Sequence, residues 1–268
     1  MMKPVLEMKQ IHKSFEIGTV NENHVLKGLD LTIYEGDFIT IIGGNGAGKS
    51  TLMNSIAGSF AVDEGEILLE GKNITKLPTV KRAKDIGRVF QDPRMGTASR
   101  LTIEENLAVA LKRGKKRGLI SGVKDDQRKI FKESLKRLGL GLEDRMKMEI
   151  GLLSGGQRQA VTLLMASLVT PKLLLLDEHT AALDPKTSQM VLDLTEKIVQ
   201  EENLTAMMIT HNMEQAIQYG NRLIMLSEGN IVVDISGEEK EQLTIPELLE
   251  LFHKNSGTML NDDALILS

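Results

Sequence analysis

Alternation of apolar and polar positions, the pattern of half-buried strands, characterises the first forty residues of the chain. Residues 5–11 alternate loosely and residues 29–33 alternate clearly. Residues 38–42 (Phe-Ile-Thr-Ile-Ile) form a short apolar run rich in β-branched side chains, which is typical of a strand buried on both faces. We therefore predict a set of N-terminal strands, the last of which runs directly into glycines at positions 43 and 44.

Further apolar runs predict strands in the second half of the chain. Residues 173–176 are four consecutive leucines, and residues 206–210 form another short apolar run. Residues 223–227 and 230–235 predict a hairpin with Glu228-Gly229 at its turn.

Helical spacing of apolar residues separates these strands, at 49–57, 103–111 and 125–138. Strands that alternate with helices predict an α/β fold, here a parallel sheet with an antiparallel β fringe. Residues 92–166 show little strand character and are predicted to be an inserted helical subdomain.

The predicted domains follow from this pattern. Residues 1–91 and 167–240 would form the α/β core lobe, with 92–166 as the helical subdomain and 241–268 as a C-terminal helix and tail. Thr244, followed by Glu247 three residues later, resembles a capping box at the start of that last helix.

Composition narrows the class of protein. Of 268 residues, 41% are hydrophobic and 26% charged, which is typical of a globular chain with a substantial core. Only 3% are aromatic and none is Trp, which argues against a stacking platform for nucleic acid, and the formal charge of −4 gives no general attraction to it. The absence of cysteine excludes disulfides and thiolate metal sites.

No segment of the sequence has the pattern of a membrane span. The longest mostly apolar stretch, residues 160–169, is far shorter than the roughly 20 residues that cross a bilayer. Residues 1–10 carry three charged side chains and no continuous apolar run, so we expect no secretory signal there. A membrane role is therefore expected to come through a partner.

Residues 43–50 (Gly-Gly-Asn-Gly-Ala-Gly-Lys-Ser) fit the pattern G-x-x-x-x-G-K-[ST]. Glycines let backbone N–H groups converge on phosphate oxygens, and the following helix presents its positive N-terminus to the same anion. Lys49 can then reach the β- and γ-phosphates, and Ser50 can ligate Mg²⁺. The alternative is a glycine-rich turn with a surface lysine, which the flanking strand and helix disfavour.

Asp177 and Glu178 end the leucine strand, and ligands of open α/β sheets bind at the carboxyl ends of strands. We expect Asp177 to hold Mg²⁺ and Glu178 to polarise a water molecule as general base; a solvated strand end is the alternative. Gln91 suits a contact with Mg²⁺ or water, and His211, after the 206–210 run, can bond to a γ-phosphate. Taken singly, neither of these two residues would indicate a site.

Residues 153–159 (Leu-Ser-Gly-Gly-Gln-Arg-Gln) predict a second helix start that can bind an anion. Ser154 is a good N-cap, and Gly155 and Gly156 expose the backbone. Because this start has no lysine of its own, two such starts with one lysine suggest sites shared between two subunits. An ordinary capped helix is the alternative.

Together, these segments resemble the ATP-binding subunit of ABC transporters over about residues 5–237, in order and in spacing. The matching segments are the Walker A loop (43–50), the Q-loop (Gln91), the LSGGQ signature (153–157), the Walker B strand (173–178), the D-loop (Ala182-Leu183-Asp184), the switch histidine (His211) and the aromatic that stacks on adenine (Phe15). The resemblance implies a P-loop NTPase with a RecA-like parallel sheet.

The resemblance also implies an ATPase that uses ATP and Mg²⁺. Its catalytic residues would be Glu178, His211 and Lys49, and its Mg²⁺ ligands Ser50, Gln91 and Asp177. Nucleotide contacts would come from Phe15, Gly43, Asn45, Gly46, Ala47, Gly48, Lys49, Ser50, Thr51, Gln91, Ser154, Gly155, Gly156, Gln157 and Asp184.

The partners implied by the resemblance are a second ATPase subunit, expected to be an identical chain, transmembrane permease subunits and an extracellular substrate-binding protein. Two subunits would close head to tail over two ATP molecules, with Ser154 and Gly156 of one copy facing the γ-phosphate held by Lys49 of the other. The helical subdomain would grip the permease, with Gln91 linking that contact to the nucleotide. We expect a peripheral location at the cytoplasmic face of the cell membrane, and no nucleic acid.

Residues 91–97, 101–106 and 177–180 look like those of bacterial amino-acid importers of the tryptophan/tyrosine or branched-chain type. Uptake of a small solute, an amino acid, is therefore the first hypothesis. The alternatives are the ATPase of a lipid or lipoprotein extraction or export system, and a soluble ABC-type ATPase acting on DNA or ribosomes. The presence of Lys49, Asp177, Glu178 and His211 disfavours an inactive regulator.

Two positions depart from the family pattern, which usually has Pro at position 179 and often has Pro or Ser at position 44. His179 raises the hypothesis of a proton-sensitive contact near Glu178, against a substitution without consequence.

Basic residues gather between positions 112 and 137. This segment contains eleven basic and three acidic residues, which gives it a net charge of +8. The segment is interpreted as a solvated helical face, a surface near anionic lipid or the permease, or a nucleic-acid contact. The eleven are Lys112, Arg113, Lys115, Lys116, Arg117, Lys124, Arg128, Lys129, Lys132, Lys136 and Arg137.

Overall fold

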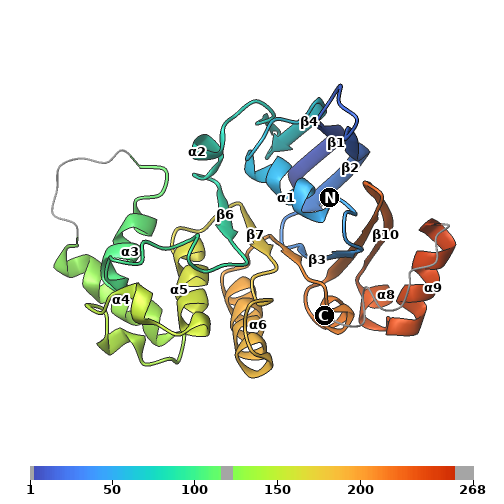
Figure 1. Ribbon diagram of the computed structural model, residues 1–268. Helices are drawn as coiled ribbons and strands as arrows, with labels where there is room; N and C mark the ends of the chain where they lie inside the picture. The colour runs from blue at the N-terminus through green and yellow to red at the C-terminus, as the bar shows by residue number, and fades with distance from the viewer. Residues whose placement is uncertain (1–2, 116–122, 257–268) are drawn as a thin grey trace. The chain divides into compact units, whose positions relative to one another are not determined.

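The computed structural model describes residues 3–115 and 123–256, and the chain divides into two compact units (Figure 1). Unit 1 consists of Met1–Arg82 and Leu204–Ser268, and unit 2 of Ala83–Asn203. The predicted tail at 257–268, and Lys116 and Arg117 of the basic segment, lie outside the described residues.

Unit 1 contains two sheets. The first is antiparallel, in the order β2 (Asn23–Tyr34), β1 (Pro4–Phe15), β4 (Glu64–Leu69) and β5 (Lys72–Asn73). In the second, β3 (Phe38–Gly43) lies parallel to β8 (Ala206–Ile209) on one side and to β9 (Arg222–Ser227) on the other, and β10 (Asn230–Ser236) pairs antiparallel with β9. The prediction of parallel strands with an antiparallel fringe is confirmed, as is the hairpin with Glu228-Gly229 at its turn.

The helices of unit 1 are α1 (Lys49–Ala57), α2 (Thr79–Arg82), α7 (Met213–Gln218), α8 (Glu238–Glu241) and α9 (Ile245–Ser256). A buried apolar cluster joins β3, α7, β9, β10 and α9, and includes Ile42, Met225 and Phe252. The predicted pair at the start of α9 forms, with the Thr244 amide and hydroxyl both donating to the Glu247 carboxylate.

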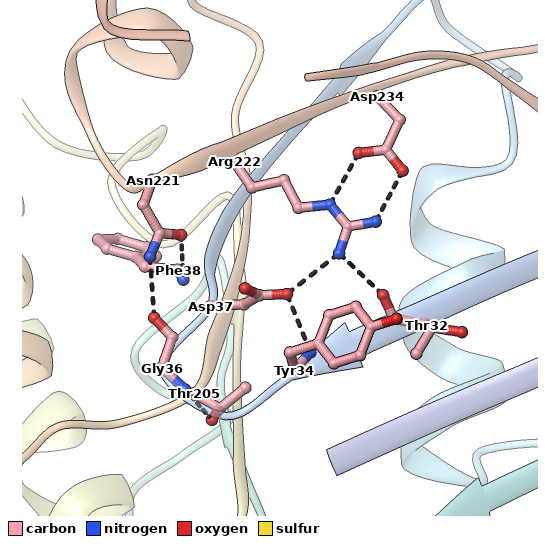
Figure 2. Close-up of polar contacts among 9 residues, drawn as sticks. All are labelled: Thr32, Tyr34, Gly36, Asp37, Phe38, Thr205, Asn221, Arg222 and Asp234. Atoms are coloured by element: carbon pink, nitrogen blue, oxygen red, sulfur yellow. Dashed lines mark hydrogen bonds and ion pairs between the residues drawn. The ribbon is translucent and has the colours of Figure 1, made fainter. Parts of the chain in front are cut away.

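Arg222, at the start of β9, joins the two sheets of unit 1 (Figure 2). Its guanidinium makes two hydrogen bonds of 2.7 Å to Asp234 on β10, one of 2.8 Å to the Thr32 carbonyl on β2 and one of 3.0 Å to Asp37. Asp37 also accepts from the amide of Tyr34 at 2.9 Å. Because Asp37 directly precedes β3, this network fixes where β3 begins relative to its neighbours.

Unit 2 contains a parallel strand pair and a group of helices. β6 (Ile86–Val89) pairs in parallel with β7 (Leu173–Asp177), whose four leucines are fully buried. The helices are α3 (Ile103–Leu111), α4 (Asp125–Lys136), α5 (Gly155–Ser167) and α6 (Pro185–Glu201), with short 3₁₀ turns at Leu142–Asp144 and Ile150–Leu152. The predicted helical character of residues 92–166 is present over the part that the structure describes.

Three strands were not predicted, β4, β5 and β6. β6 has only four residues, one a glycine and one an arginine, so it carries no apolar run. The compact units divide at 82/83 and 203/204, whereas the sequence pattern placed boundaries at 91/92 and 166/167; the predicted three-part division stays a prediction. Over the described residues, no helix is both long and apolar enough to cross a membrane.

Candidate active site

The phosphate loop, which is the Walker A segment at residues 43–50, connects β3 to α1 in unit 1, as predicted. β3 is buried along its whole length, and α1 begins at Lys49 directly after Gly48, whose φ of 101° is left-handed. The Lys49 ammonium donates to the carbonyl oxygens of Gly43 at 2.6 Å and Gly44 at 3.1 Å. Because these carbonyls belong to the loop itself, Lys49 lies where it can exchange a carbonyl for a phosphate oxygen.

The shape of this loop depends on the turn between β9 and β10. A Cβ on Gly43, which has a φ of +151°, would lie 2.3 Å from the carbonyl oxygen of Leu226 on β9. The amide of Gly229, in the turn, donates to the Ala47 carbonyl of the loop at 3.1 Å. A Cβ on Gly229 would lie 2.1 Å from the Val25 carbonyl oxygen. Only glycine fits either close approach.

His211 lies at the same edge of the sheet as the phosphate loop. It follows β8, which pairs in parallel with β3, and the amide of Thr210 donates to the Ile41 carbonyl at 3.1 Å. Since the carboxyl ends of adjacent parallel strands meet at one edge, unit 1 brings His211 to the side on which the loop begins. Asn212 then caps α7 by accepting from the Gln215 amide at 2.9 Å.

Phe15, the predicted adenine-stacking aromatic, ends β1 and is 36% exposed. Phe60 contacts it in an edge-to-face arrangement, with ring centroids 5.3 Å apart and an interplanar angle of 87°. Lys13 places its ammonium 5.3 Å and 5.4 Å from the two ring centroids and pairs with Asp63 at 2.7 Å. Sequence analysis missed Phe60, because a lone aromatic in the bend that follows α1 gives no signal for this contact.

In unit 2, Asp177 and Glu178 stand at the carboxyl end of β7, and Gln91 stands just beyond the carboxyl end of β6. The two strands are parallel neighbours, so their ends share one edge. Glu178 has a φ of 46°, a left-handed backbone that costs about 1 kcal/mol for a residue with a side chain and is often found at active sites. Asp177 accepts a 2.8 Å hydrogen bond from Arg88, a residue of β6 that sequence analysis did not single out.

His179, next to Glu178, is 1% exposed. Its Nε2 lies 2.9 Å from the hydroxyl of Thr195 on α6, and that hydroxyl donates to the Val191 carbonyl at 2.8 Å. Burial lowers the pKa of His179 from its ordinary value of 6.5 to about 4. The side chain is therefore neutral near pH 7, which argues against a proton-sensitive contact there and for an anchor of the strand end on α6.

The signature segment starts α5 in the predicted way. The Ser154 hydroxyl accepts from the Gln157 amide at 3.3 Å, and the Gln157 side chain accepts from the Ser154 amide at 3.2 Å, which completes a capping box. Ser154 and Gly155 are exposed and Gly156 is buried. Gln159 donates to the Phe90 carbonyl at 3.0 Å, so α5 also holds the backbone directly before Gln91.

Asp184, the D-loop acid, caps α6 by accepting from the Thr187 amide at 3.1 Å, and its hydrogen bonds to Thr187 lower its pKa. The remaining nucleotide contacts expected from sequence, Asn45, Gly46, Ser50 and Thr51, lie on the exposed or half-buried surface of the phosphate loop and of the first turn of α1.

The side chains expected from sequence to hold Mg²⁺ carry oxygen donors, which this ion prefers. Among residues 3–115 and 123–256, no group of three or more His, Cys, Asp or Glu side chains could hold a metal ion. Mg²⁺ is usually held by one or two carboxylates together with substrate phosphates and water. In unit 2, the Asp177 carboxylate and the Gln91 amide oxygen are hard oxygen donors of that kind. In unit 1, the Ser50 hydroxyl is another.

Much of the basic segment is paired within unit 2. Arg128 bonds Glu104 and Asp125, Lys132 pairs with Asp144, and Lys136 pairs with Glu133. Arg137 pairs with Glu201 and Glu202, and Arg113 donates to the carbonyls of Ala166 and Val169. The local excess of positive charge is thus smaller than the count in sequence, and part of the segment serves to tie helices together.

Comparison with known proteins extends this picture. The family model described as ABC transporter matches residues 26–181, more than half of the chain. A tyrosine transport ATP-binding protein of Clostridioides difficile is 46% identical over 248 residues, which cover 92% of this chain and 98% of that protein. A methionine import ATP-binding protein of Enterococcus faecalis is 38% identical over 85% of this chain and 64% of that protein.

Solved structures show the same likeness. A dimeric ATP-binding cassette in a post-hydrolysis state, bound to ADP and phosphate, has a TM-score of 0.73 and 32% identity, covering 86% of this chain and 98% of its own. A nucleotide-free cassette from an ABC transporter has a TM-score of 0.75 and 27% identity, and the match covers 93% of this chain and 98% of its own.

Proposed function

The chain belongs to the ABC transporter family and is an ATPase subunit of the importer type, and from that premise we propose that it drives the uptake of an amino acid, with tyrosine as the first candidate. The tyrosine proposal is supported by the Clostridioides difficile relative, which is named for tyrosine transport and is matched over 98% of its length. The importer type is preferred over lipid extraction because the relatives described above are named for transport or import.

The observation that carries the ATPase proposal is the lysine-bearing loop between β3 and α1. Lys49 bonds two carbonyls of its own loop, a contact that a phosphate oxygen can replace. The Gly44–Lys49 amides and the start of α1 offer further donors to the same phosphates. We assign Phe15 to the adenine ring, since its side chain is partly exposed and the contacts of Phe60 and Lys13 hold it in place.

Glu178 is proposed as the general base. Its carboxylate would take a proton from water as the water oxygen bonds to the γ-phosphorus and the bond to the β-γ bridging oxygen breaks, which yields ADP and phosphate. The His179–Thr195 contact would fix the base by anchoring the next residue. His211 is proposed to bond to the γ-phosphate. Ser50, Gln91 and Asp177 would hold Mg²⁺, which when bound neutralises charge on the phosphates.

Two copies of the chain are proposed to act together. The capped start of α5 has an exposed serine and no lysine, so Ser154 and Gly156 are assigned to the γ-phosphate bound by Lys49 of the other copy. Dimeric cassettes of the family support this arrangement. We further propose permease subunits and an extracellular substrate-binding protein as partners, with the chain peripheral at the cytoplasmic face of the membrane.

The test compares hydrolysis, nucleotide binding and uptake. Glu178→Gln should slow MgATP hydrolysis roughly a hundredfold or more while ATP-bound dimers accumulate. Lys49→Ala should instead weaken nucleotide binding. Glu133→Gln, which alters an exposed acid on α4, is the matched control and should hydrolyse at the parental rate. Hydrolysis by Glu178→Gln at the parental rate would show that the base is another group.

The substrate proposal needs a cellular assay, because the permease and binding protein select what is carried. Cells whose only copy carries Glu178→Gln should lose uptake of labelled tyrosine. Uptake of methionine and of spermidine, measured in parallel, should be unchanged. Loss of methionine or spermidine uptake with normal tyrosine uptake would refute the tyrosine assignment and leave the ATPase assignment standing.

A further inference from the structure

Arg88 contacts the carboxylate of Asp177, which is proposed above as a ligand of Mg²⁺. Its Nη2 lies 2.8 Å from Asp177 Oδ2, and the two side chains are 16% and 17% exposed. The register of the sheet explains the contact. Arg88 is the cross-strand partner of Leu175 on β7, and Asp177 lies two residues further, on the same face. The long side chain of Arg88 therefore extends along β7 to its carboxyl end.

A second contact holds the guanidinium in that position. Its central carbon lies 4.6 Å from the ring centroid of Phe90, which follows directly after the end of β6. The Phe90 carbonyl in turn accepts from Gln159 of α5 at 3.0 Å. The cation is thus held between an aromatic ring and a carboxylate, with its environment set by α5, β6 and β7.

We propose that Arg88 is a built-in competitor for the divalent cation at Asp177. In the absence of Mg²⁺–nucleotide, the guanidinium supplies the positive charge that the half-buried carboxylate needs. When Mg²⁺ arrives with the nucleotide, Asp177 gives up or shares this contact, and the guanidinium and Mg²⁺ repel one another. Arg88 therefore raises the Mg²⁺ concentration that the site requires, and it disfavours binding of free cation without nucleotide. This inference rests on the proposed role of Asp177.

The experiment measures divalent cation binding directly. Full-length protein with bound ADP is titrated with Mn²⁺, and free Mn²⁺ is followed by electron paramagnetic resonance. Arg88→Met removes the charge and keeps an apolar chain over Phe90, and we expect half-saturation at roughly tenfold lower Mn²⁺. Arg88→Lys, which keeps the charge, should stay within about twofold of the parent. Arg137→Met is the matched control, since it removes another ion-paired arginine of unit 2, and it should not change the titration.

An unchanged or higher half-saturating concentration in Arg88→Met would overturn the proposal, because it would show that Arg88 is neutral or helps the cation to bind. ADP binding in the presence of a chelator reports whether the variant is folded. If it is not, Arg88→Gln, which keeps a donor for Asp177 without the charge, has the same expected result and the same overturning one.

A double variant separates this inference from the proposed function. In an Asp177→Asn background, Arg88→Met should have no effect on Mn²⁺ binding. If Asp177→Asn itself binds Mn²⁺–ADP like the parent, the assignment of Asp177 fails and the competition fails with it. If Asp177→Asn weakens Mn²⁺ binding while Arg88→Met leaves it unchanged, only the competition is refuted.

Discussion

Acidification should destabilise the protein through His179. The side chain is 1% exposed, and its Nε2 lies 2.9 Å from the Thr195 hydroxyl, which already donates to Val191. Nε2 of His179 is therefore the donor of this bond, and burial keeps the ring neutral near pH 7. Replacing it with Gln keeps a donor for Thr195 and removes the group that titrates, so His179→Gln is the perturbation that isolates its contribution.

The size of the effect follows from the lowered pKa. In the folded protein the pKa of His179 is about 4, and in the unfolded chain we take the ordinary value of 6.5. Below pH 6.5 the unfolded chain gains a proton that the folded protein does not, so the free energy of unfolding falls with decreasing pH until about pH 4, where the folded protein also protonates. At about 1.4 kcal/mol per pH unit, acidification from about pH 6.5 to pH 5 should cost about 2 kcal/mol.

Urea unfolding followed by circular dichroism measures this, since the chain has no Trp for fluorescence. The parent should lose about 2 kcal/mol more than His179→Gln between these two pH values. His253→Gln, which removes an exposed histidine on α9, is the control and should lose as much as the parent.

Equal pH dependence in the parent and in His179→Gln would refute the reasoning, because it would mean that His179 titrates alike in the folded and unfolded states. A greater loss of stability in the variant would refute it as well. A difference in the free energy of unfolding that is the same at every pH is the first of these refuting results, and its size reports only the altered packing of the side chain.

Two further predictions concern unit 1. Arg222→Met should destabilise the protein by about 3 kcal/mol, because it leaves Asp37 and Asp234 without their shared cation. Urea unfolding at neutral pH measures this loss, and a change below about 1 kcal/mol would contradict the role of the network. Gly229→Ala should weaken binding of a fluorescent ADP analogue, because the added Cβ would lie 2.1 Å from the Val25 carbonyl oxygen and disturb the turn that supports the phosphate loop. The control Gly237→Ala, with no atom within 4 Å of the added Cβ, should bind the analogue like the parent. Equal affinities of Gly229→Ala and the parent for the analogue would contradict the role of this turn.

The sequence predicted the elements whose cause is local. The apolar run of β3, the glycines after it and the helix at Lys49 adjoin one another, so strand, loop and helix could be placed together. The Ser154 cap was predictable for the same reason, since a capping box acts over three residues. These local patterns, taken in order, were enough to identify the family.

Contacts between distant segments could not be predicted in this way. Arg88 and Asp177 are 89 positions apart, and they meet only because of the register in which β6 pairs with β7. β6 itself is too short to give a strand pattern. His179 shows the converse case, because its residue type indicated a proton-sensitive group, while complete burial against α6 keeps it neutral.

The hydrogen bond from Gly229 to Ala47 also bears on how the protein is made. The phosphate loop leaves the ribosome early, and the turn that supports it follows roughly 180 residues later. A nascent chain that has emerged only as far as α6 holds every residue of the loop but lacks the partner that fixes its backbone. We therefore expect nucleotide binding to arise late in synthesis, when the β9–β10 hairpin has emerged, so that ATP engages finished copies of the chain rather than partial ones.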